Sequence, residues 1–472
     1  MPNRQNAVRS LILLVALAFV PQAAAEANPK TVLPEASSNL SDYVKQPDSS
    51  YAWRVRQRGK AGTGDYAELI LTSQTWHDIV WKHQLFIYRP AKVRESAQAL
   101  LLIDGGSWSD SLENPPDESK PTDLPGQVRV ITMLADMMQS PIAVVRQVPN
   151  QPIFDGRKED QIIALTFSKY FETGQADWPL LLPMVKSAVR AMDTVQKFAQ
   201  QEWQMDVQRF LVTGASKRGW TTWLTAATDP RVDALAPMVI NMLNMAEHDR
   251  LQLKSFGTRS EEIRDYTERG LQEKMHTKQG ESLRAIIDPI AYRAQLTQPK
   301  LIILATNDAY WPVDALNLYW KDLTGDKYIL YVPNNGHGIK DYPRVAATVA
   351  ALQRSLGGDK PMPKLEWRID DQANPPKLEL TSDKTPLAVR QWSAAADTRD
   401  FRQAVWKSAP VSASNGDSHQ FAIDLTEPTH GFSARFLEAE FPGETVPFML
   451  STTLHVLGDA DRATATGGAD PD

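Results

Sequence analysis

The sequence predicts an α/β fold, with a mainly parallel sheet covered by helices on both faces and a smaller all-β region after it. Two observations carry this prediction. Between residues 99 and 357, short continuous apolar runs alternate with helical segments, and such runs are typical of strands buried on both faces of a parallel sheet. After residue 357 the helical period ends and strand-like runs follow one another. A chain of 472 residues is long enough for two domains.

The N-terminal residues have the features of a secretory signal peptide. Arg4 and Arg9 give a basic start, the apolar run LILLVALAFV follows, and Ala23 and Ala25 stand at the small-residue positions of a cleavage site. An apolar run of this length is short for a membrane span. We expect cleavage after Ala25, loss of residues 1–25, and export to the periplasm or the medium of a bacterium.

The alternating part of the chain, residues 51–357, is expected to form the α/β domain, after a polar, extended arm at 26–50. Residues 241–298 are more charged and helical, and they interrupt the alternation. We expect them to form a lid insertion. Strand-like runs lie at 67–76, 79–90, 99–104, 141–149, 209–214, 233–240, 300–308 and 327–333. Helix-like runs lie at 124–139, 178–203, 218–228, 312–323 and 342–356.

The C-terminal part begins after the linker-like stretch GGDKPMPK. Residues 358–457 contain about seven short strand-like runs separated by turn signals. This spacing is typical of a small β-sandwich of immunoglobulin-like type. The last residues, 458–472, are polar and are expected to be a disordered tail.

Composition excludes several classes of function. The chain has no cysteine, which rules out disulfides and thiolate catalysis. Its net charge of -6 gives no indication of a nucleic-acid partner or of an anionic membrane surface. No metal-binding spacing such as H-E-x-x-H and no glycine-rich phosphate loop occurs, so we expect no metal and no cofactor. After signal cleavage no stretch is apolar enough for an integral membrane segment.

A candidate nucleophile lies in the stretch LVTGASKRG, between a strand-like and a helix-like run. A sharp turn at Ser216 would expose its hydroxyl and direct the amide groups of the helix start toward a substrate oxygen. Such a turn is crowded, and Gly214, Ala215 and Gly219 are the small residues that it requires. The alternative is a helix-capping serine, which is the commoner role at this position.

Two further reactive residues follow strands at their carboxyl ends, where open parallel sheets bind ligands. Asp308 ends the run LIILATND, and His337 lies between two glycines in NNGHG. Helix capping is the alternative for Asp308. Asp314, Glu247 and Asp249 are rivals for the acidic role.

Together these residues indicate a catalytic triad. Ser216, Asp308 and His337 occur in the chain order that the α/β-hydrolase fold uses. A neutral serine is a weak nucleophile, so His337 would take its proton, and Asp308 would fix the tautomer of the imidazole.

Other residues near these turns could support the reaction. The amide of Lys217, with that of Gly106 or Ser107, could hold an oxyanion, because glycines at 105 and 106 allow close approach of the backbone. Trp108 and Trp311 could line a pocket, since aromatic faces bind apolar or sugar surfaces; a core position is the alternative for both.

A charged pair could fix the serine turn. Glu159 and Asp160 precede a helix, where acidic residues usually interact with the helix dipole. The functional interpretation is a salt bridge to Arg218, either at the serine turn or at the rim of the substrate site.

Several long segments, GASKRGWTTWLTAATDPRV, WPLLLPMVKSAVRAMDTVQKF, ATNDAYWPVDA and NNGHG, together resemble the PhoPQ-activated pathogenicity-related (PqaA-type) protein family. The resemblance covers about residues 40 to 460. It implies an α/β-hydrolase-like protein exported from bacteria, with a link to virulence and to resistance against host antimicrobial peptides. It carries over to Ser216, Asp308 and His337. The serine turn is also similar to that of glucuronoyl and acetyl-xylan esterases.

These observations predict an exported serine hydrolase, in the first place an esterase, that acts on a small molecule, a glycan or a peptide. Two alternatives stay open. One is a non-catalytic binding or virulence factor on the same scaffold, because a fold does not imply an activity. The other is a secreted peptidase, which requires that the insertion at 241–298 admit peptides.

Overall fold

The computed structural model describes residues 33–94, 98–115, 126–358, 360–414 and 416–458. These residues belong to one compact unit. The predicted signal peptide and all but the first residue of the predicted tail lie outside them. In the part of the chain that the structure describes, no helix is both long and apolar enough to span a bilayer.

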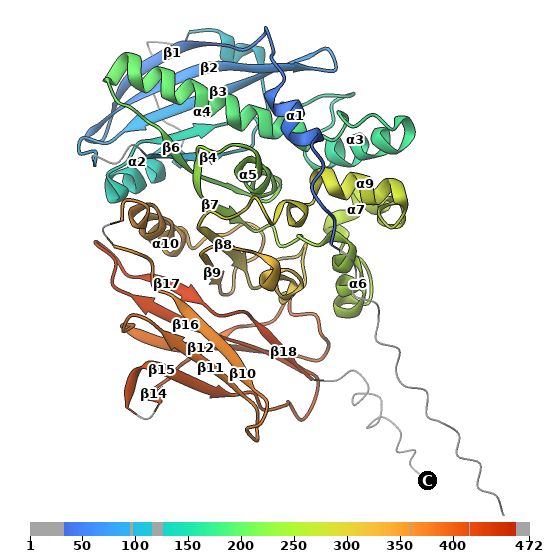
Figure 1. Ribbon diagram of the computed structural model, residues 1–472, viewed down its shortest axis with the longest axis vertical. Coiled ribbons are helices and arrows are strands. Elements are labelled where there is room, and N and C mark those ends of the chain that lie inside the picture. Colours follow the sequence, from blue (N-terminus) through green and yellow to red (C-terminus); the bar gives the residue numbers. More distant parts are fainter. Residues whose placement is uncertain (1–32, 95–97, 116–125, 359, 415, 459–472) are drawn as a thin grey trace, which may run out of the picture. The chain divides into compact units, whose positions relative to one another are not determined.

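One large sheet forms the centre of the first part of the chain (Figure 1). Its strands are β1 (Ala52–Ala61), β2 (Gly64–Trp76), β3 (Ile79–Arg89), β4 (Gln98–Ile103), β5 (Ile142–Val145), β6 (Arg209–Ala215), β7 (Val232–Met238), β8 (Lys300–Ala305) and β9 (Lys327–Val332). They lie in the order β1-β2-β3-β5-β4-β6-β7-β8-β9. The first three strands are antiparallel, and β5 and all strands beyond it are parallel. This is a mainly parallel sheet of the α/β-hydrolase-like type, as predicted.

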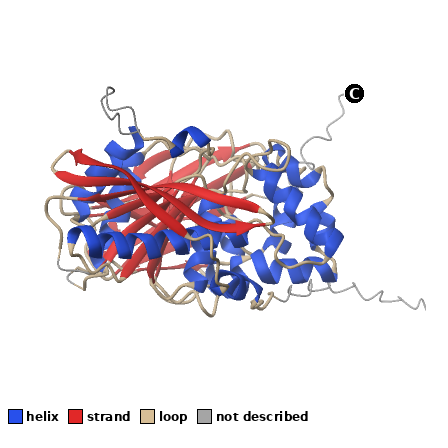
Figure 2. Ribbon diagram, turned by 90° about the horizontal axis from the view of Figure 1, so that it is seen from above, coloured by secondary structure: helices blue, strands red, loops and turns tan. Residues whose placement is uncertain are grey.

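Helices cover both faces of this sheet (Figure 2). The helices that contact its strands are α2 (Gly126–Met138), α4 (Leu181–Trp203), α5 (Lys217–Thr228) and α10 (Tyr342–Ser355). Two further helices lie outside these: α1 (Asn39–Lys45) packs on α4, and α3 (Asp160–Thr173) packs on the helices of the insertion described below. Neighbouring residues of β4 enter two different cores. Leu101 packs in the core that holds Phe198 of α4 and Trp223 of α5, whereas Leu100 packs with Ala135 of α2 and Val349 of α10. Side chains alternate along a strand, so the two cores lie on opposite faces of the sheet.

The predicted insertion is helical and follows β7. It contains α6 (Met245–Phe256), α7 (Arg264–Thr267), α8 (Leu271–Met275) and α9 (Lys278–Ile287), with short 3-10 turns at Glu261–Ile263 and Pro289–Tyr292. In Figure 1 these helices lie together with α3 on one side of the sheet. Contacts of α3 with α7, α8 and α9 hold the insertion to the rest of the fold.

The C-terminal part is a β-sandwich, as predicted. Its strands are β10 (Leu365–Asp370), β11 (Lys377–Ser382), β12 (Ala388–Ala396), β13 (Lys407–Pro410), β14 (Ala413–Ser414), β15 (Asp417–Asp424), β16 (Phe432–Phe441), β17 (Phe448–Ser451) and β18 (His455–Leu457). They pair in the orders β10-β11-β15-β14 and β13-β12-β16-β17, with β18 beside β16. Leu380, Phe421 and Leu437 are buried between the two sheets. The domain boundary at residues 357 and 358 stays a prediction.

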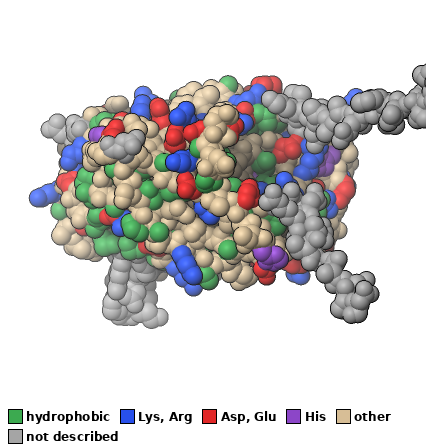
Figure 3. Space-filling model, turned by 90° about the horizontal axis from the view of Figure 1, so that it is seen from below, with side chains coloured by type: hydrophobic (Ala, Val, Ile, Leu, Met, Phe, Trp, Pro, Cys, Tyr) green, Lys and Arg blue, Asp and Glu red, His purple; other side chains and the backbone are tan. Residues whose placement is uncertain are grey.

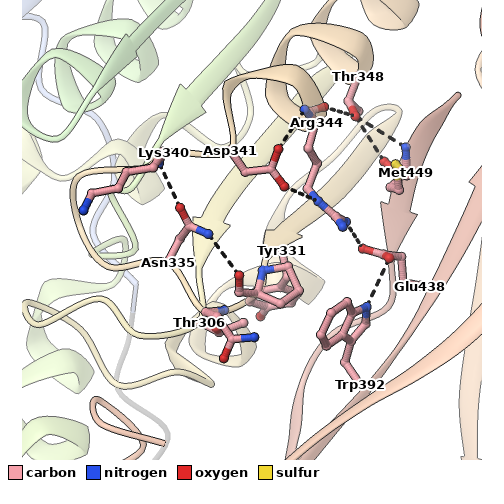
Figure 4. A network of polar contacts seen from close by, with 12 residues as sticks. Thr306, Tyr331, Asn335, Lys340, Asp341, Arg344, Thr348, Trp392, Glu438 and Met449 are labelled. Atoms are coloured by element: carbon pink, nitrogen blue, oxygen red, sulfur yellow. Dashed lines mark hydrogen bonds and ion pairs between the residues drawn. The ribbon is translucent and has the colours of Figure 1, made fainter. Parts of the chain in front are cut away.

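A polar network joins α10 to the sandwich (Figure 4). The guanidinium of Arg344 pairs with the carboxylate of Glu438 on β16, and its Nε donates to Asp341 at 3.1 Å. The indole of Trp392 donates to the other oxygen of Glu438 at 3.1 Å. Burial raises the pKa of Glu438, although Arg344 and Trp392 oppose the shift. The carboxylate therefore depends on these two partners.

Two sequence predictions were wrong. Residues 39–45 are helical and 52–61 form a strand, so the N-terminal arm is neither fully extended nor followed directly by the strand at 67–76. The helix expected at 312–323 is replaced by 3-10 turns at Ala315–Leu318 and Trp320–Asp322. One polar side chain of this segment has a distant partner: Asn317 donates to the carbonyl of Leu454 at 2.8 Å. The carbonyl of Leu323, at the end of the segment, accepts the nearby ammonium of Lys327 at 2.9 Å.

Surface charges of both signs are mixed on the face shown in Figure 3. Lys and Arg side chains lie among Asp and Glu side chains there, in agreement with the small net charge of -6.

Candidate active site

Ser216 lies at the turn between β6 and α5, in a strained backbone conformation. Its φ is 57° and its ψ is -128°, and it makes no capping hydrogen bond to the helix that follows. A non-glycine residue adopts such angles only where its surroundings hold it there. Its amide donates to the carbonyl of Met238 at 2.8 Å. A Cβ at Gly219 would lie 2.7 Å from Ile240, which explains the small residue there. The capping alternative for Ser216 is wrong.

The turns after β8 and β9 bring Asp308 and His337 together. The imidazole Nδ1 of His337 lies 2.9 Å from Oδ2 and 3.0 Å from Oδ1 of Asp308. Asp308 is buried, and its Oδ1 also accepts the amide of Tyr310 at 2.9 Å. The Tyr310 ring packs on the imidazole with a centroid distance of 4.1 Å. With Nδ1–H donated to the carboxylate, Nε2 is the acceptor atom of a neutral imidazole.

Two cavities border Ser216. The larger one has a volume of about 870 Å³ and is also lined by His337 and Gly106. The smaller one has a volume of about 120 Å³ and lies under the helical insertion, where Lys217 and Trp311 line it. Nε2 of His337 is buried and has no hydrogen-bond partner among the described residues. The structure therefore places Ser216 and His337 on one cavity without a hydrogen bond between them.

Of the three predicted oxyanion donors, Lys217 and Gly106 each line a cavity beside Ser216, whereas Ser107 lines neither of the two. Lys217 is the first residue of α5, so its amide belongs to the free N–H groups of a helix start. Gly106 lines the larger cavity in a left-handed conformation with φ of 111°. Ser107 is exposed and, like Trp108, is not among the described residues that line either cavity.

Trp108 lines neither of these two cavities. Its amide donates to the carbonyl of Gln151 at 2.7 Å, and its ring lies 5.9 Å from the ammonium of Lys82. Trp311, by contrast, is among the residues that line the smaller cavity.

Four charged side chains, Glu159, Asp160, Lys217 and Arg218, form what we call the charged brace. Arg218 donates to Glu159 at 2.7 Å and to the carbonyl of Val148 at 2.6 Å. The ammonium of Lys217 lies 3.0 Å from Glu159 and 3.1 Å from Asp160. Burial raises the pKa of Glu159, but Arg218 and Lys217 outweigh this effect and hold that pKa at about 2. The brace thus ties the two residues after Ser216 to α3.

Gln151 completes the brace and was missed by sequence reasoning. Its Nε2 donates to Glu159 at 2.6 Å and to the carbonyl of Gly106 at 3.0 Å, while its Oε1 accepts the amide of Glu159 at 2.8 Å. It thereby links the turn at Gly106 to the brace. In the sequence Gln151 is only a polar residue before a proline, and this pattern does not indicate which groups it would bind.

The loops that carry Asp308 and His337 are bonded to the C-terminal part. Asn307 donates through Nδ2 to the carbonyl of Ala404 at 2.7 Å. Asn334 donates to the carbonyl of Trp406 at 3.0 Å and accepts its amide at 2.8 Å. The segment before β13 therefore holds both loops in place.

The rival acids have other partners. Asp314 pairs with Arg399, Asp249 pairs with Arg259 at 2.7 Å, and Glu247 pairs with Arg250 at 2.7 Å. Within the described ranges, no group of three or more His, Asp and Glu side chains could hold a metal ion.

A family model described as "PhoPQ-activated pathogenicity-related protein" matches residues 40–402. The chain belongs to this family. The chain is also 30% identical over 440 residues to the autocrine proliferation repressor protein A of Dictyostelium discoideum, with 86% of each chain covered. The family predicted from the sequence is therefore confirmed.

Solved structures with weaker similarity include two esterases. Acetyl xylan esterase 1 from Thermoanaerobacterium sp. JW/SL YS485 has a TM-score of 0.46 and 13% identity, over 69% of this chain and 95% of that one. A glucuronoyl esterase from Solibacter usitatus has a TM-score of 0.40 and 16% identity, over 67% of this chain and 91% of that one.

Proposed function

We propose that this protein is an exported serine hydrolase that cleaves carboxylic esters through Ser216, His337 and Asp308. One observation carries the proposal: a serine in a strained strand-to-helix turn shares a cavity with an imidazole whose other nitrogen is bonded to a buried carboxylate. This is the arrangement that activates a hydroxyl as a nucleophile.

The proposed reaction has two steps. Ser216 Oγ attacks the ester carbonyl while its proton passes to Nε2 of His337, and the amides of Lys217 and Gly106 stabilise the oxyanion. His337 then gives the proton to the leaving alcohol. Water then gives a proton to His337 and attacks the acyl carbonyl, and His337 returns that proton to Ser216 Oγ as the acid leaves. Asp308 stabilises the imidazolium in both steps, and none of these steps requires a cofactor.

The cellular setting is part of the same proposal. The signal-like segment at residues 1–25 supports export, and the family description supports a role in pathogenicity. The domain division, with an α/β-hydrolase-like part at 51–357 and a sandwich at 358–457, is proposed with it.

A non-catalytic role on this scaffold is the second candidate. It is favoured by one observation, the absence of a hydrogen-bond partner for Nε2 of His337 among the described residues. Catalytic hydrogen bonds are often long in free enzymes and tighten when substrate binds, so this geometry is compatible with both candidates.

Labelling with a fluorophosphonate separates the two. We expect the purified protein to react with the probe at Ser216, and the Ser216→Ala variant to remain unlabelled. A folded protein that does not react would overturn the enzymatic proposal. Parallel assays with acyl esters and with peptides then distinguish an esterase from a peptidase.

A further inference from the structure

Arg146 lines the larger cavity beside Ser216, and the proposed reaction does not use it. It directly follows β5, as Asp104 directly follows β4. These two strands are parallel neighbours, so both residues lie at the edge of the sheet that also carries Ser216. The side chain of Arg146 is 25% exposed. A positive charge at the candidate catalytic cavity is therefore accessible from solvent.

The two terminal nitrogens of this guanidinium are open. Nε lies 3.3 Å from Oδ2 of Asp104, which is longer than the ~2.7–2.9 Å of a strong hydrogen bond between charged groups. Within the described chain, Nη1 and Nη2 have no hydrogen-bond partner, and they are not among the unpartnered polar atoms that are buried from solvent. These two nitrogens carry most of the N–H donors of an arginine, in the planar fork that fits a carboxylate.

The guanidinium lies against the turn that carries a proposed oxyanion donor. A Cβ at Gly106 would lie 3.3 Å from Nη2 of Arg146, and Gly106 lines the same cavity. Glycine therefore leaves space between this turn and the guanidinium. Nη2 thus lies next to the backbone that would bind the ester carbonyl in the proposed reaction.

Backbone hydrogen bonds fix Arg146 at this position. Its amide donates to the carbonyl of Gln84 at 2.9 Å, and its carbonyl lies 2.9 Å from Nδ1 of His83. Burial lowers the pKa of His83 to about 4, so this imidazole is neutral near pH 7 and adds no charge. The amide of Gln147 donates to the carbonyl of Gly105 at 2.9 Å. The arginine therefore belongs to a rigid part of the sheet, as a specific binding site requires.

The other charges that line this cavity leave the fork of Arg146 available. Arg218 is bound to Glu159 at 2.7 Å, and Glu159 also pairs with Lys217 at 3.0 Å, so this acid already has its partners. Asp104 offsets part of the charge of Arg146, but it contacts only Nε. An anionic group of a ligand can therefore bind Nη1 and Nη2 without displacing an existing hydrogen bond.

We propose that Arg146 binds a carboxylate of the substrate, so that this protein prefers esters whose acyl or alcohol part carries a carboxylate. The inference rests on the proposed function and adds the class of substrate to it. The planar fork of arginine binds a carboxylate with two parallel hydrogen bonds, and a neutral group of the same size cannot replace both charges and bonds. Arg146 is a specificity-determining residue in this proposal.

The test compares matched esters that differ in one charged group. The full-length protein is assayed near pH 7.5 with two pairs. In the first pair, 4-acetoxybenzoate and 4-acetoxybenzamide, the carboxylate or its neutral amide lies in the alcohol part. In the second, the 4-nitrophenyl monoesters of adipic and adipamic acids, it lies in the acyl part. We expect kcat/KM for the carboxylate to exceed that for the amide by about tenfold or more in at least one pair, because hydrogen bonds between charged groups are the stronger ones.

Variants assign the preference to Arg146. Arg146→Gln removes the charge, and the ratio of the two rate constants, carboxylate over amide, should fall toward one. Arg146→Lys keeps the charge without the fork and should give an intermediate ratio, so it also serves if the glutamine variant does not fold. Arg58→Gln removes the same charge from an exposed arginine of β1 that pairs with Glu202; it is the matched control and should keep the wild-type ratio.

The outcomes separate the two proposals. If esters are hydrolysed and Ser216 reacts with a fluorophosphonate, but neither pair shows a preference for the carboxylate, the carboxylate site is wrong and the hydrolase stands. The same holds if the Arg146 variants slow both members of a pair equally, since the arginine then acts on the fold or on the oxyanion. If no ester is cleaved and Ser216 is not labelled, the hydrolase proposal fails and the carboxylate site fails with it.

Discussion

The turns before α5 and α3 have nearly the same backbone conformation, but their side chains have different surroundings. Ser216 precedes α5 with φ 57° and ψ -128°, and Glu159 precedes α3 with φ 54° and ψ -129°. The side chain of Glu159 is held by Arg218, Lys217 and Gln151. The side chain of Ser216 makes no cap and faces two cavities. The turn before α5 presents the Ser216 hydroxyl, and the turn before α3 binds Lys217 and Arg218, the two residues that follow Ser216.

The comparison shows how strain at the candidate site is maintained. A residue in such a conformation costs about 1–3 kcal/mol and persists only when its surroundings fix it. Arg218 and Lys217 lie directly after Ser216 and end on Glu159. Each strained turn therefore contributes to holding the other.

Removing the hydroxyl should have the largest effect. We expect Ser216→Ala to lower kcat for an activated ester by about 10⁴-fold or more, with an unfolding midpoint close to that of the wild type, because no capping bond is lost. Ester hydrolysis and thermal unfolding measure the two quantities. Wild-type turnover in this variant would show that another residue is the nucleophile.

Removing the charge of the second turn should have a smaller effect on activity. Glu159→Gln keeps the size of the side chain but leaves Arg218 and Lys217 without their shared carboxylate. We expect kcat/KM for an ester to fall by about 10- to 100-fold as the serine turn loses its fixed position. Glu172→Gln, on the same helix but with an exposed Lys169 partner, is the control. Equal activity of the two variants would show that the brace does not position Ser216.

Glycine should reveal the strain in both turns. We expect Ser216→Gly to be more stable than Ser216→Ala, and Glu159→Gly more stable than Glu159→Ala, each by about 1 kcal/mol of unfolding free energy. In an ordinary helix the order is reversed by about the same amount. Denaturant unfolding of the four variants gives both differences. If alanine is the more stable residue at either position, that turn is not strained.

The smallest expected effect is a pH dependence of stability. The pKa of Glu159 is about 2 in the folded state and about 4.3 in an unfolded chain. The stabilisation is therefore fully present above the unfolded value and is lost as pH falls toward 2. Because the Glu159 side chain is 38% exposed, solvent screening limits the gain to about 1 kcal/mol. The difference in unfolding free energy between wild type and Glu159→Gln should shrink between pH 5 and pH 2; a constant difference would contradict this.

The sequence predicts the parts of the fold and of the site that depend on a local pattern, such as a strand-like run and the residue that follows it. The carboxyl ends of parallel strands share one edge of a sheet, so the strand-like runs that precede Ser216, Asp308 and His337 are enough to predict that these residues lie near one another. The salt bridge between Glu159 and Arg218 was one of two interpretations, and the structure contains it.

The rest depends on contacts between distant segments. Gln151 and Tyr310 support the site through partners that no local pattern indicates. The edge strand at 52–61 was missed because its charged residues are typical of loops as well as of exposed edges. The expected helix at 312–323 was wrong because partners such as Leu454 lie more than a hundred residues away.

The hydrogen bonds from Asn307 and Asn334 to residues 404 and 406 limit where this chain can be shortened. A chain that ended after α10 would lose the bonds that hold the loops of Asp308 and His337. The family model, which ends at residue 402, stops only two residues short of this anchor. The sandwich therefore takes part in holding the candidate catalytic pair, and a change in the segment before β13 would reach Asp308 and His337 through Asn307 and Asn334.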